Sequence, residues 1–95
     1  MAGYWIVRGS AVKDQQAFER YVELWKPIGA KYGAVVLAGR GEHQCREGAS
    51  CERVLLIQFP SYEQAVACYD DPDYQVALEY AHRAADRDLI IVAGM

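Results

Sequence analysis

Two cysteines and a histidine lie close together in the polar stretch that spans residues 39–52. His43 and Cys45 are two positions apart, so an extended backbone would place both side chains on one face, with Cys51 opposite them across a hairpin. Imidazole and thiolate groups bind zinc, but this His-x-Cys-x5-Cys spacing is not a recognised zinc motif and lacks a fourth ligand. We therefore expect no metal and no other cofactor, and we favour two unpaired thiols over a labile Cys45–Cys51 disulfide.

Arg8 is a candidate for binding an anion. Its predicted strand face also carries Tyr4 and Ile6. A guanidinium group among apolar neighbours must pair with a carboxylate or face a cavity that holds an anionic ligand. Two alternatives follow: a structural Arg8–Asp88 pair, or a catalytic Arg8 that orients the anionic group of a substrate. We favour the pair, because buried charges usually find partners.

Two histidines could move protons. His82 lies near the end of the last predicted helix, where the helix dipole favours a protonated imidazole. It would serve as a general acid or base if it faced a cleft between the helices and the sheet. His43 could play the same part from the polar stretch. For His82, a half-exposed surface position without chemistry is the favoured interpretation.

A substrate pocket would take its walls from aromatic residues on the predicted helices. Trp25, Tyr32 and Tyr69 occupy helical core positions, and Gln58 is a polar residue within an apolar strand. Aromatic walls with a few polar groups suit a small apolar ligand. The simpler alternative is that these aromatic side chains only pack the core.

Four strands are expected where β-branched and aromatic residues form short runs bounded by glycine or proline, at 3–9, 34–38, 54–59 and 88–93. A structureless loop as long as residues 39–52 is unusual in a small domain. We therefore predict that this stretch is a glycine-kinked extension of the second strand, which reverses near residues 47–48 and leads into the third strand.

The helices are predicted from their apolar stripes and caps. The first begins after Asp14 as N-cap and closes at residue 33, and Pro27 is expected to kink it or to end its regular part. The second is interrupted: it starts at a capping box on Ser61 and restarts at Asp71 and Pro72. The element order is therefore strand, helix, strand, strand, broken helix, strand.

This order predicts a single α+β domain over residues 1–95, a ferredoxin-like βαββαβ fold with the helices on one face of a four-stranded antiparallel sheet. A sheet with one solvated face alternates polar and apolar residues. Here the strands are apolar on both faces, at 34–38, 54–57 and 89–92. The open face would be too large an apolar patch for a monomer, so we predict a homodimer that pairs through it.

The composition limits the partners. The 95 residues are 53% hydrophobic and 24% charged, with a net charge of -3. Nucleic-acid binding requires a dense basic patch, and the Lys and Arg residues here are scattered. The chain shows no signal-peptide pattern and no run near the roughly 18 apolar residues of a membrane span. An odd number of cysteines fits a reduced protein, so we expect a cytoplasmic protein without nucleic-acid or membrane partners.

Five segments carry a family resemblance, at residues 3–6, 31–33, 57–61, 68–74 and 84–86. Together they resemble domain of unknown function 1330, in the dimeric α+β barrel superfamily. The resemblance spans nearly the whole chain and implies the fold and the dimer predicted above. Members of the family often carry Trp at the position of Cys68, Glu at Gln58 and an Arg near Ala81, so a site built from those side chains would be lost or altered here.

The resemblance implies no single reaction, since the superfamily includes cofactor-free monooxygenases, haem-degrading enzymes, lactone isomerases and proteins without known activity. One hypothesis is a cofactor-independent enzyme acting on a small hydrophobic or carboxylate-bearing molecule, with Arg8 orienting it and His82 or His43 moving protons. The alternative is a non-catalytic dimeric binding or accessory protein. A third, weaker hypothesis is a redox- or metal-sensing hairpin. A cavity that reached both Arg8 and a histidine would favour the enzyme.

Overall fold

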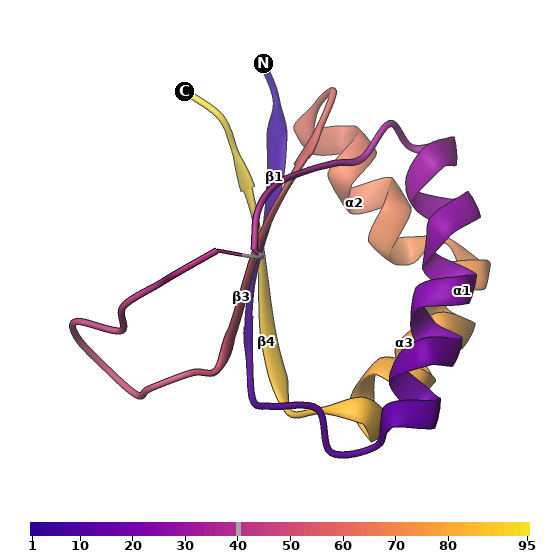
Figure 1. The fold of residues 1–95 in the computed structure, drawn as a ribbon. Coiled ribbons are helices and arrows are strands. Elements are labelled where there is room, and N and C mark those ends of the chain that lie inside the picture. Colours follow the sequence, from indigo (N-terminus) through magenta and orange to yellow (C-terminus); the bar gives the residue numbers. More distant parts are fainter. Residues whose placement is uncertain (40) are drawn as a thin grey trace.

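The computed structural model describes residues 1–39 and 41–95, and Figure 1 shows three helices lying on one side of a sheet. The strands are β1 (Gly3–Gly9), β2 (Val35–Ala38), β3 (Arg53–Phe59) and β4 (Arg87–Ala93), and the helices are α1 (Gln15–Lys31), α2 (Tyr62–Asp70) and α3 (Pro72–Ala84). The predicted order is confirmed, with the two parts of the broken helix as α2 and α3. None of the helices described here is long and apolar enough to cross a lipid bilayer.

The sheet has the strand order β2-β3-β1-β4, and every neighbouring pair is antiparallel. This is the predicted ferredoxin-like arrangement. The central strand β1 pairs with β3 on one side and with β4 on the other. At one edge, β2 is only four residues long, and a bulge between Val36 and Ala38 interrupts its ladder with β3.

The core between the sheet and the helices is built on Trp5. Its side chain is 1% exposed, and its indole Nε1 donates a hydrogen bond to the carbonyl oxygen of Ala65 at 3.0 Å. The rings of Phe59, Tyr74 and Trp25 surround it with centroid separations of 5.0, 5.1 and 5.4 Å. Because the indole N–H is satisfied, this large side chain adds its full apolar area to the core. It also joins β1, β3 and all three helices.

The sheet face away from the helices is apolar and uncovered in the single chain. Ile6 of β1 lies opposite Ile90 of β4, and their side chains are 42% and 60% exposed. Val92 and Val35 enlarge the same apolar surface. Alternation along each strand therefore produces two apolar faces, as predicted, and the helices cover only one of them.

Helix α1 continues through its internal proline. Asp14 caps the helix, as predicted, because its carboxylate accepts a hydrogen bond from the backbone N–H of Ala17 at 3.0 Å. Of the two predicted effects of Pro27, an early end of the helix is excluded, since α1 runs on to Lys31. Ile28 directly after the proline is 6% exposed. Its burial helps to offset the roughly 3 kcal/mol that an interior proline costs a helix.

The segment between β2 and β3 differs from the prediction. Strand β2 ends at Ala38, and residues 41–52 form no strand, so the predicted extension of the second strand is wrong; position 40 lies outside the described residues. Figure 1 shows this segment leaving the sheet as a loop. Gly48 has a φ of 85°, which suits a turn near the predicted reversal. The stretch is almost wholly polar, so a longer ladder would bury no apolar side chain.

Asp71 links the junction of α2 and α3 to the end of α1. One carboxylate oxygen caps α3 by accepting from the backbone N–H of Asp73 at 2.8 Å. The other accepts from the Tyr32 hydroxyl at 2.6 Å and from the Lys31 ammonium at 3.0 Å. The bond from Tyr32, followed by those from Asp73 and Lys31, lowers the pKa of Asp71 to about 2.

The Asp71 carboxylate makes the free energy of unfolding depend on pH. Its pKa is lower in the folded chain than the ordinary value of 3.8, so its contribution is fully present above pH 3.8 and disappears as the pH falls through about 2. We expect Asp71→Asn to lower the melting temperature at neutral pH and to flatten the loss of stability over this pH window. Thermal unfolding at neutral pH measures the first effect, and urea unfolding at a series of pH values measures the second. The exposed neighbour provides the control: Asp70→Asn should retain the native pH dependence, and an identical profile for Asp71→Asn would contradict the assignment.

Candidate functional site

A cavity of about 330 Å³ lies between the sheet and helices α1 and α3. Most of its lining is apolar or aromatic, and includes Trp5, Val7, Phe18, Trp25 and Ile57. Polar groups also reach it: the lining contains the phenol of one tyrosine and the guanidinium groups of two arginines, which are Tyr21, Arg53 and Arg87. The cavity therefore combines aromatic walls with a small cationic region.

The two arginines come together because of the register around Gly9. Gly9 at the end of β1 pairs with Arg53 of β3 on one side and with Arg87 of β4 on the other. Directly paired residues project to the same face, so both arginines point toward the helices. Gly9 places no side chain between them, and a Cβ atom there would lie only 2.9 Å from the carbonyl oxygen of Asp86. A glycine at this position thus leaves space between the two guanidinium groups.

In the part of the chain that the structure describes, neither arginine is neutralised by a carboxylate. Among the described residues, the ion pairs within 4.0 Å involve neither Arg53 nor Arg87. Arg53 places its Cζ 4.8 Å from the ring centroid of Phe18, and Arg87 donates to the hydroxyl of Tyr74 at 2.9 Å. Burial, and then the positive charge of Arg87, lowers the pKa of Arg53. Both side chains stay protonated, because guanidinium groups do not lose their proton in proteins.

A pair of tyrosines extends this polar region. The hydroxyl oxygens of Tyr21 and Tyr74 are 3.0 Å apart. Burial, followed by the neighbouring Tyr21, raises the pKa of Tyr74, so its phenol stays protonated. Tyr74 accepts from Arg87, and within the described part of the chain its own proton has only Tyr21 as acceptor. Since a buried hydroxyl proton needs an acceptor, Tyr74 donates to Tyr21, which leaves the Tyr21 proton available to the cavity.

The predicted wall residues occupy different places. Trp25 lines the cavity. The rings of Tyr69 and Trp5 pack edge-on with their centroids 5.9 Å apart, and the Tyr32 hydroxyl donates a hydrogen bond to Asp71. Gln58 lies on the uncovered face of the sheet, since its strand partners are on that face. Only one of the four therefore contributes to the lining in the described structure, and substrate-binding roles for the others stay predictions.

The predicted catalytic residues Arg8 and His82 lie outside the cavity. Arg8 points to the uncovered face and donates to the carbonyl oxygen of Ala49 in the β2–β3 loop. Asp88 is its partner in strand register, yet no ion pair joins the two charges among the described residues. His82 is exposed in the last turn of α3. Their catalytic roles stay predictions, and the structure does not bring them together.

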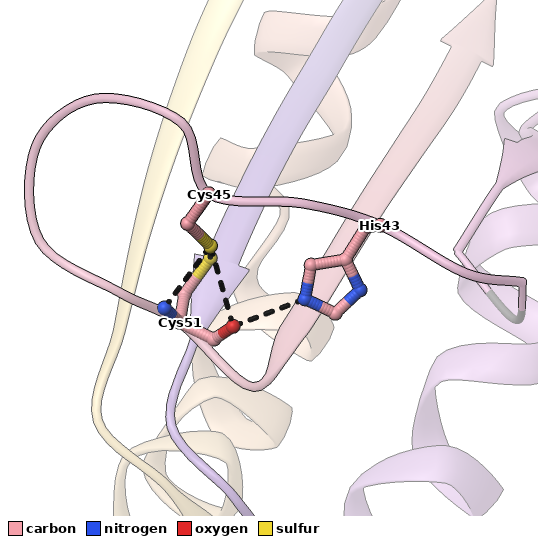
Figure 2. Close-up of side chains that lie close together, drawn as sticks. All are labelled: His43, Cys45 and Cys51. Carbon is pink, nitrogen blue, oxygen red and sulfur yellow. Dashed lines mark hydrogen bonds between the residues drawn. The ribbon is translucent and has the colours of Figure 1, made fainter.

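The loop between β2 and β3 does bring three predicted residues together, as Figure 2 shows. The sulfur atoms of Cys45 and Cys51 are 3.1 Å apart, and the Cys51 backbone N–H donates to the Cys45 sulfur at 3.3 Å. The imidazole Nε2 of His43 is 3.0 Å from the Cys51 carbonyl oxygen. One ligand atom from each residue lies within 4.8 Å of the other two, so these three are the described residues best able to hold a soft metal ion.

The cationic region of the cavity was not predicted from the sequence. Arg53 and Arg87 stand one residue before the predicted starts of their strands and looked like ordinary strand boundaries. Counting every second residue back from the buried positions of each strand would have placed both arginines on the helix-facing side of the sheet. Arg53 is in phase with the buried Ile57, and Arg87 is in phase with Leu89 and Ile91, which pack against the core.

Comparison with known proteins supports the fold. No curated protein matches the chain. A protein of unknown function from Rhodopseudomonas palustris is 19% identical, with a TM-score of 0.74, over 99% of this chain and 82% of that chain. A dimeric ferredoxin-like protein of unknown function from Thermobifida fusca is 14% identical, with a TM-score of 0.62, over 99% and 92% of the two chains. A dimeric protein of unknown function and ferredoxin-like fold from Bacteroides fragilis is 13% identical, with a TM-score of 0.58, over 98% and 96%. At these identities the likeness establishes the fold alone.

Residues 2–95 match the family described as domain of unknown function, DUF1330. The match extends over nearly the whole chain and confirms the resemblance carried by the five sequence segments. The family match assigns no reaction, so the proposed function rests on the cavity. The chain belongs to the DUF1330 family.

Proposed function

We propose that this protein binds a small aromatic or apolar molecule that carries a carboxylate, in the cavity between the sheet and helices α1 and α3. The observation that carries the proposal is the pair Arg53 and Arg87, which reach an apolar cavity of about 330 Å³ without a carboxylate partner among the described residues. Two nearby guanidinium groups repel each other. An anionic ligand between them would reduce this repulsion and accept charge-assisted hydrogen bonds.

The size and walls of the cavity define the rest of the ligand. A volume of about 330 Å³ is at the small end of the range for ligand pockets, so one or two rings fit better than a nucleotide. Phe18 and Trp25 of α1 supply flat apolar surface for a ring. The available Tyr21 proton adds a hydrogen-bond donor to the cationic region. These features together favour an aromatic or apolar carboxylic acid.

Binding without chemistry is the function that the lining supports best. Proton abstraction needs a base, and the described lining offers neither an imidazole nor a carboxylate. A second candidate, a cofactor-independent enzyme, draws support from one observation: Tyr21 and the two arginines could together stabilise an oxyanion that forms during a reaction. Turnover of a bound acid by the purified protein would favour the enzyme over the binding protein.

The uncovered face of the sheet supports a homodimer. Ile6, Ile90 and Val92 form an apolar surface that a second copy would bury, and two structural neighbours are described as dimeric. Two-fold pairing is the commonest way to cover such a surface. The ligand cavity lies on the opposite, helix-facing side of the sheet. Dimerisation would therefore leave the cavity within each subunit.

The ligand proposal predicts a charge-dependent affinity. We expect benzoate or naphthoate to bind more tightly than the corresponding neutral amide in isothermal titration calorimetry. Replacing Arg53 by methionine should raise the dissociation constant of the acid about 10- to 100-fold, because hydrogen bonds to charged groups contribute about 1.5–3 kcal/mol. The Arg53 side chain forms no hydrogen bond with other described residues, and its contact with the Phe18 ring can be kept in part by a methionine side chain, so this change mainly removes the charge.

A matched substitution separates this effect from the loss of one positive charge anywhere on the protein. Arg83 is exposed on α3, and Arg83→Met should leave the affinity for both probes unchanged. Weakening of the acid and of its neutral amide by the same factor in Arg53→Met would contradict the anion site. So would equal binding of the two probes by the native protein.

The dimer proposal predicts that a charge on the uncovered sheet face separates the subunits. Ile90→Asp should raise the dissociation constant of the dimer more than about 100-fold, because an unpaired charge in an interface costs about 3 kcal/mol or more. Sedimentation equilibrium measures this constant. The control is Val76→Asp: this residue is 53% exposed but lies on α3, so the dimer should persist. A native protein that sediments as a monomer would refute the proposal.

A further inference from the structure

The two thiols of the β2–β3 loop are placed to react with each other. The sulfur atoms of Cys45 and Cys51 are 3.1 Å apart, and a disulfide bond is about 2.05 Å long. Both residues belong to one exposed loop, so they can approach without moving a strand or a helix. Figure 2 shows the side chains pointing toward one another across the loop. A small local movement is therefore enough to form the bond.

We propose that Cys45 and Cys51 form a reversible dithiol–disulfide pair that exchanges with low-molecular-weight disulfides such as oxidised glutathione. The site is separate from the ligand cavity, whose lining contains neither cysteine. It therefore does not depend on the proposed binding function. It would give this protein an oxidised and a reduced form that differ in one loop.

The exchange proceeds in two displacements. The Cys45 thiolate attacks one sulfur of the small disulfide, forming a mixed disulfide and releasing one small thiol. The Cys51 thiolate then attacks the Cys45 sulfur, and the second small thiol leaves. Two protein thiols lose two electrons and two protons in total, and one small disulfide is reduced to two thiols. The reverse sequence restores the dithiol.

Cys45 is suited to make the first attack. It is exposed, and its sulfur accepts a hydrogen bond from the backbone N–H of Cys51 at 3.3 Å. Hydrogen bonds from the Cys51 side chain and backbone lower the pKa of Cys45. The positive charge of Arg8, on the neighbouring sheet face, acts in the same direction. Cys51 is less exposed, and the Cys45 sulfur raises its pKa. These contacts assign attack to Cys45 and resolution to Cys51.

The remaining cysteine and the nearby histidine do not compete for this role. Cys68 is fully buried in the core, and burial raises its pKa to about 12. It is therefore neither accessible nor nucleophilic in the folded chain. His43 directs Nε2 at the Cys51 carbonyl oxygen, 3.0 Å away, and Nε2 is the donor in this contact because a carbonyl oxygen only accepts. In this arrangement the two thiols contact each other while the imidazole contacts the backbone.

The test uses the full chain, reduced, freed of metal with a chelator and equilibrated with mixtures of reduced and oxidised glutathione. After acid quenching and maleimide labelling, intact-mass analysis should show a species that has lost two hydrogen atoms and retains one thiol. Its fraction should rise as the share of oxidised glutathione rises. Fragmentation should place the bond between Cys45 and Cys51. Reduced glutathione should reverse it.

Two substitutions on the exposed loop separate the roles of the thiols. Cys51→Ser should trap a single glutathione adduct on Cys45, because the resolving thiol is absent. Cys45→Ser should form its adduct on Cys51 about tenfold more slowly, since the thiolate is the nucleophile. Neither residue belongs to the hydrophobic core cluster, and circular dichroism should show that both variants fold.

Three results would overturn the proposal. One is an unchanged mass at the most oxidising glutathione ratio. Another is a product in which both thiols of the native protein carry glutathione or link two chains. The third is a metal site: one equivalent of zinc chloride would then protect both thiols from maleimide, while oxidised glutathione would form no internal bond.

Discussion

The burial of Trp5, with its indole N–H bonded to the carbonyl oxygen of Ala65, is the interaction on which the rest of the structure depends. The ring contacts side chains from β3 and all three helices, and it forms part of the cavity lining. If it were removed, the helices would lose their common contact with the central strand. The same alternation that turns Trp5 inward turns Ile6 outward. One strand therefore determines both the position of the cavity and the composition of the surface available for association.

The two faces of the sheet separate the charged groups into two environments. Arg8 reaches the loop on the uncovered side, whereas Arg53 and Arg87 reach the cavity on the side of the helices. Gly9 follows Arg8 directly in the sequence, and its missing side chain leaves room between the two inward arginines. An anion that enters between helices and sheet therefore meets a positive charge from strands β3 and β4, and none from β1.

Much of the fold could be predicted from local sequence because the caps and strand boundaries have strong local causes. Asp14, Ser61 and Asp71 each accept the backbone hydrogen bond that their residue type suggested. The cationic region could not be found in this way, because it arises from pairing across strands far apart in sequence. The loop after β2 was wrongly predicted as an extension of the strand, because a loop of this length is unusual in a small domain. Its residues are almost wholly polar, so a longer strand ladder would have buried no apolar side chain. Pro27 shows the converse, since tertiary burial of Ile28 overrides a local helix breaker.

The short, bulged edge strand β2 has a consequence for how copies of this chain can meet. A flat edge strand offers a row of unpaired backbone groups on which another chain can add a strand, and repeated addition leads to open fibres. Strand β2 has four residues and an irregular register between Val36 and Ala38. Such an edge gives an incoming strand few groups to pair with. Extension of the sheet from this edge is thereby disfavoured, which leaves the seven-residue strand β4 as the edge on which a further strand could add.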